Sequence, residues 1–220
     1  MRRVLKNFDG FIFDIDGTLA STHDLIFASF NHVADKYLHR TFTNEEISSL
    51  FGPTEDVILK EWMKEDYERA REDYFDFYSS QHVEMADVFP GIVEVLKLIK
   101  SKKLPIGIYT GKGKDSSIIT LRQIGVLDMF DIVITGDDVE EHKPSPEGIN
   151  KFVNYFGLDP AKVLMIGDAV FDVKAAQDAG VKSALVLWDA YAKEKYSNVT
   201  ADYIFNTVDE LTRFLEMNLS

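Results

Sequence analysis

Six short runs of β-branched and aromatic residues recur along the chain, and most of them lead into a turn and then a helical pattern. The runs cover residues 11–15, 106–110, 132–135, 163–166, 184–187 and 203–205. Because they are apolar at consecutive positions, they suit strands that are covered on both faces, with helices as right-handed crossovers between them. The pattern predicts an α/β fold built on a doubly wound parallel sheet.

A long helical stretch interrupts this alternation after the first run. Residues 16–105 separate the first run from the second, whereas a single crossover needs only about a dozen residues. Within this stretch, apolar residues recur at helical spacing from about residue 25 to residue 85. We therefore expect an inserted helical cap domain at residues 21–85, with hinges near residues 20–24 and 83–91. A Rossmann-like core would combine residues 1–20 and 86–220.

Glycine and proline indicate where several helices end and begin. Gly125, Gly157 and Gly180 each follow a helical pattern, as a left-handed residue at a helix C-terminus requires. Ser145 followed by Pro146 is typical of a helix N-cap with proline in the first turn. These residues support the alternation of strands and helices outside the insertion.

Composition and charge narrow the class of protein. The 220 residues are 45% hydrophobic and 12% aromatic, which is enough to bury a sizeable core. The absence of cysteine excludes disulfides, thiolate metal sites and a cysteine nucleophile, so any metal must be bound by oxygen or imidazole. A formal net charge of -13 opposes binding to nucleic acid and to anionic membranes, and we expect neither partner.

The sequence also gives no signal for export or membrane insertion. The basic start at residues 1–6 is followed by apolar residues that Asp9, Asp14 and Asp16 interrupt, so no signal-peptide core forms. No apolar stretch reaches the length that spans a bilayer. We therefore expect a cytoplasmic protein.

An acidic motif, Asp14-Ile15-Asp16-Gly17-Thr18, directly follows the first predicted strand. Two carboxylates separated by one residue point to the same side of an extended chain, and glycine lets the chain turn there. Crowding like charges is costly unless a cation or a shared proton compensates them. The alternative is a structural turn with Thr18 as a helix N-cap, but the motif favours a chemical site.

A second acidic pair, Asp168 and Asp172, follows Gly167 at the end of a later strand. Alone, this pair is ambiguous, because carboxylates are also favoured in the first turn of a helix. In an open parallel sheet, however, ligands bind beyond the carboxyl ends of the strands at a switch point. Both acidic groups stand at such ends, and together they form an all-oxygen site that suits Mg²⁺ better than Zn²⁺.

Two further loops supply groups that bind an anion. Thr110-Gly111-Lys112-Gly113 ends the second strand, where a hydroxyl and backbone N–H groups are suited to a phosphoryl oxygen. Lys143 lies in a proline-containing loop after the third strand and offers a fixed positive charge. Lys112 and Lys143 both fit the role of the anion's partner, and their positions in the loops do not separate them.

In this order and spacing, the motifs resemble the haloacid dehalogenase superfamily of phosphohydrolases, most closely the phosphoglycolate phosphatase-like branch with a helical cap. The resemblance covers nearly the whole chain. It implies a Mg²⁺-dependent phosphatase that hydrolyses a small phosphorylated metabolite through an aspartyl-phosphate intermediate. It also implies that Asp14 is the nucleophile and Asp16 the acid/base.

The resemblance also implies the residues that bind the phosphoryl group and the metal. The implied phosphoryl-binding residues are Thr110, Gly111 and Lys143. The implied Mg²⁺ ligands are Asp14, the backbone carbonyl of Asp16, Asp168 and, in the first or second shell, Asp172. Many relatives carry Ser or Asn where this chain has Gly111, so a side-chain contact to the phosphoryl group is absent at that position.

Three alternatives remain open from the sequence. A sugar phosphomutase of the β-phosphoglucomutase type would use the same carboxylates, but its cap must hold a bisphosphate and exclude water. A dehalogenase fits less well, because members with that activity lack the second aspartate found here as Asp16. A non-catalytic binding protein on the same fold fits least, because every motif position is filled.

The leaving group of the substrate and the oligomeric state are not determined by these motifs. The core motifs bind only the phosphoryl group, so the cap must contact and select the rest of the substrate. The candidates are His23 at the hinge and a turn that contains Phe51, Gly52 and Thr54. Glycine in such a turn permits close backbone approach to a ligand.

Overall fold

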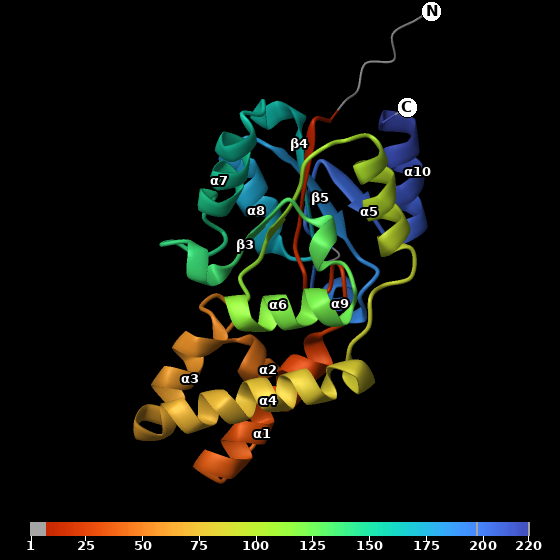
Figure 1. The fold of residues 1–220 in the computed structure, drawn as a ribbon. Helices are drawn as coiled ribbons and strands as arrows, with labels where there is room; N and C mark the ends of the chain where they lie inside the picture. The colour runs from red at the N-terminus through yellow and green to blue at the C-terminus, as the bar shows by residue number, and fades with distance from the viewer. Residues whose placement is uncertain (1–7, 197, 220) are drawn as a thin grey trace, which may run out of the picture.

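The computed structural model describes residues 8–196 and 198–219, and its centre is a parallel sheet (Figure 1). The strands are β1 (Gly10–Phe13), β2 (Ile106–Tyr109), β3 (Ile132–Ile134), β4 (Val163–Gly167), β5 (Lys182–Val186) and β6 (Tyr203–Phe205). All neighbouring strands in the sheet run parallel. The predicted doubly wound α/β fold is confirmed, and the predicted strand ends lie within two residues of the observed ones.

The strand order, β3-β2-β1-β4-β5-β6, reverses at β1. Strands β2 and β3 extend the sheet on one side of β1, while β4, β5 and β6 extend it on the other. In such sheets the ligand site lies beyond the carboxyl ends of the strands where the order reverses. There β1 and β4 are neighbours, with Phe13 opposite Ile166. The next residue after β1, Asp14, and the next after β4, Asp168, are therefore brought to the same edge.

Helices cover both faces of the sheet. The α-helices that follow the insertion are α5 (Ile92–Ser101), α6 (Lys114–Gln123), α7 (Glu147–Phe156), α8 (Val170–Ala179), α9 (Ala190–Tyr196) and α10 (Val208–Asn218). Figure 1 shows α5 and α10 on one face and α7 and α8 on the other. Along β1, Phe11 and Phe13 join the hydrophobic cluster under α5 and α10, whereas Ile12 joins the cluster under α7 and α8. Successive side chains of a strand point to opposite faces, so both faces of this run are apolar.

The insertion after β1 is helical throughout its regular elements. Its α-helices are α1 (His23–Leu38), α2 (Asn44–Ser48), α3 (Glu55–Met63) and α4 (Tyr67–Met85). We call α1–α4 the helical unit. It encloses a hydrophobic cluster of its own, with Leu25, Phe30 and Tyr74 among the fully buried members. Helix α6 lies between the helical unit and the sheet and packs against α4 (Figure 1).

Two linkers join the helical unit to the sheet, and they run side by side. The Ser21 N–H donates to the Asp87 carbonyl at 2.9 Å, and an isolated antiparallel bridge pairs Ala20 with Val88. These residues fall within the two predicted hinge segments. Both routes into the helical unit are thus tied together at the edge of the sheet that carries Asp14.

Short 3₁₀ turns and helix ends complete the chain. The 3₁₀ turns are η1 (Lys64–Asp66), η2 (Leu127–Met129), η3 (Gly136–Asp138) and η4 (Pro160–Lys162). Gly125, Gly157 and Gly180 have φ of 73°, 63° and 71° at or just beyond the ends of α6, α7 and α8, as predicted. Helix α7 begins later than predicted, with Pro146 at its N-cap, and Ser145 Oγ accepts the N–H of its first residue.

The predictions about export and membranes concern the start of the chain and the apolar character of its helices. The basic start of the chain, residues 1–6, lies outside the described residues. In the part of the chain that the structure describes, no helix combines the length and the apolar character needed to cross a bilayer.

Candidate active site

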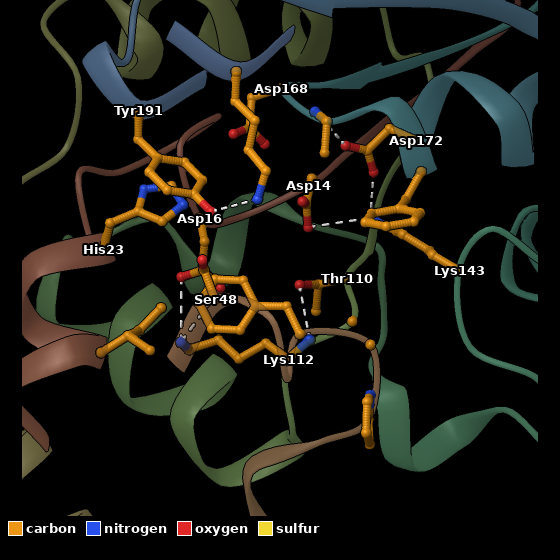
Figure 2. Close-up of a pocket in the computed structure, with 18 of the residues that line it drawn as sticks. Asp14, Asp16, His23, Ser48, Thr110, Lys112, Lys143, Asp168, Asp172 and Tyr191 are labelled. Atoms are coloured by element: carbon orange, nitrogen blue, oxygen red, sulfur yellow. Dashed lines mark hydrogen bonds and ion pairs between the residues drawn. The ribbon is translucent and has the colours of Figure 1, made fainter. Parts of the chain in front are cut away.

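Three carboxylates converge at the switch point of the sheet (Figure 2). Asp14 follows β1, Asp168 follows β4, and Asp172 lies in the first turn of α8. One oxygen from each side chain lies within 4.8 Å of the others. The structure therefore brings together three residues that the sequence assigned to one site, and we call them the carboxylate cluster.

The carboxylate cluster is crowded with negative charge, with Asp168 and Asp172 buried and Asp14 partly buried. Burial raises the pKa of Asp14 to about 6; Lys143 opposes this rise, while the charges of Asp172 and Asp16 add to it. Burial, followed by the charges of Asp172 and Asp14, holds the pKa of Asp168 well above its ordinary value. Oδ1 of Asp14 is buried and has no hydrogen-bond partner among the described residues. Like charges at this spacing need a cation to be stable as carboxylates.

Lys143 lies against the carboxylate cluster. Its Nζ is 3.2 Å from Asp14 Oδ1 and 2.5 Å from Asp172 Oδ1. Burial by itself would lower the pKa of Lys143, but the charges of Asp14 and Asp172 outweigh it and raise that pKa above its ordinary value. Lys143 therefore remains a cation beside the predicted nucleophile.

The carboxylate of Asp16 has different partners. Thr22 Oγ1 donates a hydrogen bond to Asp16 Oδ1 at 2.5 Å, and Lys112 Nζ lies 3.2 Å from the same oxygen. Burial would raise the pKa of Asp16, but Lys112 and the hydrogen bond from Thr22 outweigh burial and lower it. Asp16 is thus held as a carboxylate, and its side chain is not part of the carboxylate cluster.

The two lysines that the sequence left equivalent differ in their surroundings. Lys143 pairs with Asp14 and Asp172, whereas the ion pairs of Lys112 are with Asp16 and Glu55. Both side chains are almost fully buried. Lys143 is therefore the lysine that contacts the predicted nucleophile.

The loop after β2 lines the same pocket. Thr110 and Gly111 both face this pocket, together with the carboxylate cluster. Thr110 is buried, and its Oγ1 accepts the Lys112 N–H at 3.3 Å. A Cβ at Gly111 would meet only the Gly52 carbonyl oxygen, at 3.9 Å. The predicted phosphoryl-binding residues therefore share one pocket with Asp14.

Gly17 permits the tight turn inside the acidic motif. Its φ is +71°, a left-handed conformation that side chains rarely adopt. A Cβ there would also lie 2.3 Å from Asp168 Oδ2 and 3.0 Å from His23 Cε1. Both the conformation and the space at this position therefore require glycine.

The helical unit closes one side of the pocket, which has a volume of about 150 Å³. His23, Phe51 and Gly52, three of the four predicted specificity residues, line it. Thr54 does not; it is buried, and its Cγ2 lies 2.5 Å from the position that a Cβ on Gly136 would take. Thr54 therefore packs the helical unit against the core.

His23 lies at the entrance to α1 and stacks on Tyr191. Their ring centroids are 4.4 Å apart, with an interplanar angle of 29°. The His23 Nδ1 is 3.7 Å from Asp189 Oδ1. Burial lowers the pKa of His23, although Asp16 and Asp189 oppose the change. A neutral imidazole in this position can donate or accept one hydrogen bond in the pocket.

A family model described as haloacid dehalogenase-like hydrolase matches residues 11–186. The chain belongs to this family. Two curated relatives, each named pyrophosphatase PpaX, are those of Bacillus pumilus (strain SAFR-032) and Bacillus velezensis. The first is 30% identical over 91% of this chain and 93% of its own length, and the second is 31% identical over 94% and 95%.

Solved structures share the fold. A crystal structure described as a predicted phosphoglycolate phosphatase from Haemophilus somnus has a TM-score of 0.80 at 20% identity. The match covers 96% of this chain and 99% of that one. The solved structure supports the fold, while the family match and the curated relatives support an enzyme of the phosphoric ester hydrolase class.

The carboxylate cluster of this hydrolase fits a divalent cation. Its donors are all carboxylate oxygens, which suit a hard cation such as Mg²⁺. The buried Asp14 Oδ1 accepts no hydrogen bond among the described residues, and its ion pair with Lys143 at 3.2 Å leaves it lone pairs that can bind a metal. Burial raises the pKa values of Asp14 and Asp168 in the metal-free protein, although Lys143 opposes the rise at Asp14.

Sequence reasoning missed several residues that line the pocket, among them Tyr191, Lys195 and Glu55. Tyr191 and Lys195 come from α9, and Lys195 Nζ donates to the Tyr191 hydroxyl at 2.9 Å. This short helix carries no motif, so no signal pointed to it. Glu55 begins α3, where an acidic residue is ordinarily interpreted as a favourable charge in a helix's first turn. Its burial results from contact with α6, which is distant in sequence.

Proposed function

We propose that this chain is a Mg²⁺-dependent phosphatase that transfers the phosphoryl group of a small phosphorylated metabolite first to Asp14 and then to water. The convergence of Asp14, Asp168 and Asp172 within 4.8 Å, with Lys143 3.2 Å from Asp14, carries the proposal. This arrangement combines a nucleophile, an oxygen site for a cation and a fixed positive charge. Phosphoryl transfer depends mainly on such positioning and charge neutralisation.

The first step forms an aspartyl phosphate. The carboxylate cluster and the backbone carbonyl of Asp16 would hold Mg²⁺, which when bound supplies positive charge to the phosphoryl oxygens. An oxygen of Asp14 forms a bond to phosphorus as the bond from phosphorus to the leaving oxygen breaks. Lys143 offsets the negative charge of the phosphoryl group, and Thr110 and Gly111 bind its oxygens.

The second step returns Asp14 to its starting form. Asp16, kept ionised by Lys112, accepts a proton from the water whose oxygen attacks phosphorus. The bond between phosphorus and the Asp14 oxygen breaks, which releases inorganic phosphate and leaves Asp14 as a carboxylate. In the first step, an alkoxide leaving group needs a proton, which only the protonated form of Asp16 can donate. Inorganic phosphate is a better leaving group and needs less assistance, so an ionised Asp16 favours pyrophosphate among the possible substrates.

Small substrates suit the pocket best. Its volume of about 150 Å³ lies below the ~300–1,000 Å³ of pockets for drug-sized ligands. The name of the PpaX relatives supports pyrophosphate as the first substrate to test. Phosphoglycolate, which the motifs suggest by resemblance, is the second.

The overall negative charge of the chain does not oppose an anionic substrate. The net charge is -13, but Lys112, Lys143 and Lys195 all line the pocket, and local cations decide the field in a cleft. The cytoplasmic location and the absence of nucleic-acid and membrane partners stay predictions.

A sugar phosphomutase is the second candidate, and the lining of the pocket disfavours it. A mutase must hold the distal phosphate of a bisphosphate while water is excluded. Within residues 21–85, all of them described, no lysine or arginine lines the pocket, and the charged side chain that does is Glu55. A carboxylate would repel the distal phosphate.

A phosphate-release screen with product analysis separates these functions. We expect pyrophosphate, phosphoglycolate, a nucleotide and sugar phosphates to differ in rate, with pyrophosphate fastest in the presence of Mg²⁺. Phosphorus NMR should show inorganic phosphate appearing in step with substrate loss. An isomeric sugar phosphate as the main product would favour the mutase, and release from no substrate would refute the proposed function.

The helical unit, as a cap domain at residues 21–85, is proposed to read the leaving group through His23, Phe51 and Gly52. Phe51 lines the pocket and stacks on Phe27, with centroids 6.1 Å apart. Phe51→Ala should change the ratio of kcat/KM between two substrates by about tenfold, because a lost apolar contact discriminates by ~1–3 kcal/mol. Steady-state kinetics on pyrophosphate and phosphoglycolate measure the ratio.

The matched control for this prediction is Phe42→Ala. Phe42 stacks on Trp62 in the same helical unit, and it does not line the pocket. It should leave the ratio unchanged. A common loss on both substrates for Phe51→Ala would mean that Phe51 has a structural role only.

A further inference from the structure

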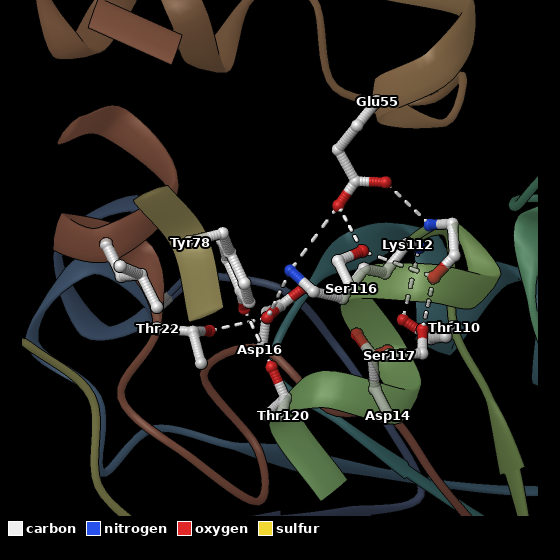
Figure 3. Close-up of polar contacts among 12 residues, drawn as sticks. Asp14, Asp16, Thr22, Glu55, Tyr78, Thr110, Lys112, Ser116, Ser117 and Thr120 are labelled. Carbon is white, nitrogen blue, oxygen red and sulfur yellow. Dashed lines mark hydrogen bonds and ion pairs between the residues drawn. The ribbon is translucent and has the colours of Figure 1, made fainter. Parts of the chain in front are cut away.

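A buried polar network joins the helical unit to the N-terminus of α6 (Figure 3). Glu55, the first residue of α3, is only 6% exposed. Its Oε2 accepts the Gly113 N–H at 2.7 Å, and its Oε1 accepts a hydrogen bond from Ser116 Oγ at 2.6 Å. Gly113 is the N-cap of α6, where backbone N–H groups lack acceptors within the helix. A carboxylate of the helical unit therefore caps a helix of the core.

Lys112 extends this network to the predicted acid/base. Its Nζ lies 3.5 Å from Glu55 Oε1, 3.2 Å from Asp16 Oδ1 and 4.8 Å from the centre of the Tyr78 ring. Glu55 and Tyr78 belong to the helical unit, whereas Asp16 belongs to the core. The Lys112 side chain is 1% exposed. Lys112 therefore pairs with both Glu55 of the helical unit and Asp16 of the core, at a site from which the helical unit excludes solvent.

The other partner of Asp16 also depends on the helical unit. Thr22, which donates to Asp16 Oδ1 at 2.5 Å, is the N-cap residue of α1. Among the described residues, Thr22 and Lys112 are the hydrogen-bond and ion-pair partners of the Asp16 carboxylate. Thr22 and Lys112 therefore both hold the Asp16 carboxylate, and the position of each depends on contacts with the helical unit.

Movement of the helical unit would dismantle this arrangement. If the unit swung away, Glu55 and Tyr78 would leave Lys112, which would then face water. Charge pairs weaken steeply when water replaces a low-dielectric site, and a buried charge that loses one partner becomes unfavourable. The contacts of Lys112 are therefore complete only when the unit covers the pocket.

We propose that Glu55 is a positioning residue, which couples closure of the helical unit over the pocket to the placement of Asp16 by sharing Lys112 with it. Glu55 acts through Lys112 and does not touch the reacting atoms. The proposal rests on the phosphatase activity proposed above. It adds that the acid/base is held in its working position only while the pocket is closed.

Amide exchange tests the contact without reference to activity. The Gly113 N–H is held by Glu55 from the helical unit, whereas the next amide, Lys114 N–H, donates to Asp137 of the core at 2.7 Å. In the free protein followed by NMR, Glu55→Ala should speed exchange at Gly113 at least tenfold and leave Lys114 unchanged. Glu55→Met, which keeps a similar side-chain length but has no oxygen acceptor, provides the same comparison if the alanine variant does not fold.

Kinetics and one resonance test the positioning of Asp16. With pyrophosphate as the probe, Glu55→Gln should lower kcat at least tenfold while KM changes less than threefold. Glu55→Asp, which keeps the charge, should recover part of the loss. The carboxyl-carbon resonance of Asp16 should move in Glu55→Gln, because Lys112 is no longer shared with a second carboxylate.

Two matched controls separate this role from a general effect of lost charge. Glu61→Gln changes an exposed carboxylate on the same helix, α3. Asp115→Asn removes an exposed ion pair between α6 and Arg71 of the helical unit. Both variants should leave kcat and the Gly113 exchange rate within twofold of the parent values and should leave the Asp16 resonance unshifted.

Three results would overturn the proposal. Gly113 exchange that is equally fast in the parent protein and in Glu55→Ala would mean that Glu55 does not hold the helical unit. An unchanged kcat and Asp16 resonance in Glu55→Gln would mean that Lys112 does not couple closure of the helical unit to the position of Asp16. An equal loss of kcat in Asp115→Asn would mean that removing any contact between the helical unit and the core lowers kcat, and that Glu55 has no special role. If the parent protein hydrolysed no substrate, the proposed function would fail, while exchange and the resonance would still decide the role of Glu55.

Discussion

Asp14→Asn is expected to remove phosphate release almost completely while the protein stays folded. An amide cannot form the aspartyl phosphate, and loss of a nucleophile costs at least about a thousandfold in kcat. The fold should not suffer, because burial and the charges of Asp172 and Asp16 already oppose a carboxylate at this position in the metal-free protein. Phosphate release and a thermal melt of the same preparation measure both effects.

Asp9→Asn is the matched control for this substitution. Asp9 directly precedes β1, as Asp14 directly follows it, and it forms an exposed ion pair with Lys162 at 3.3 Å. Exposed pairs of this kind contribute little to stability, so both activity and melting temperature should stay near the parent values. Activity of Asp14→Asn within tenfold of the parent would assign the nucleophile to another group.

The sheet and its switch point could be predicted because they depend on local patterns. Each strand is short and apolar on both faces, so its position follows from the sequence alone. The site motifs stand directly after β1 and β4. These strands are parallel neighbours, so their carboxyl ends lie together independently of the conformation of the loops. The convergence of Asp14 with Asp168 and Asp172 was therefore within reach of sequence reasoning.

The partners of the two lysines could not be predicted in the same way. Lys112 follows β2, which neighbours β1, and Lys143 follows β3, one strand farther from β1. The direction of each side chain depends on the path of its loop. The structure directs Lys143 to Asp14 and Asp172, and Lys112 to Asp16. Nothing in the spacing of residues along the chain records this choice.

The contacts between the helical unit and the core were also hidden in the sequence. Glu55 lies in a stretch rich in charged residues, where a solvent-exposed helix surface is the ordinary expectation. It is buried because α3 docks on the N-terminus of α6, more than fifty residues later in the chain. Thr54, chosen from its turn as a specificity residue, is directed into the same interface by that docking. Local pattern does not report which of two neighbouring side chains faces the substrate.

Removal of divalent metal is expected to abolish phosphate release, and Mg²⁺ is expected to restore it where Zn²⁺ does not. The carboxylate cluster offers only oxygen ligands, which suit Mg²⁺, whereas structural and catalytic Zn²⁺ sites rely on nitrogen and sulfur. Activity after exhaustive chelation, and after addition of each metal, measures the effect. Full activity in the chelated enzyme would contradict a metal-dependent mechanism and reopen the dehalogenase interpretation.

Thermal stability tests the same metal site without relying on catalysis. The pKa of Asp14 rises from 3.8 to about 6 in the folded protein, so between these pH values the metal-free folded state binds more protons than the unfolded state. The stability of the metal-free protein should therefore fall as the pH rises through this window. Mg²⁺ requires deprotonated carboxylates, so it should raise the melting temperature strongly above the window and little below it.

Two substitutions on α8 make this test specific to the carboxylate cluster. Asp172→Asn removes one member of the cluster, whereas Asp178→Asn changes an exposed aspartate near the other end of the same helix. The first should lose the Mg²⁺-dependent rise in melting temperature, and the second should keep it. An equal rise in both variants would place the Mg²⁺ elsewhere, and the raised pKa of Asp14 would then reflect burial without a metal to relieve it.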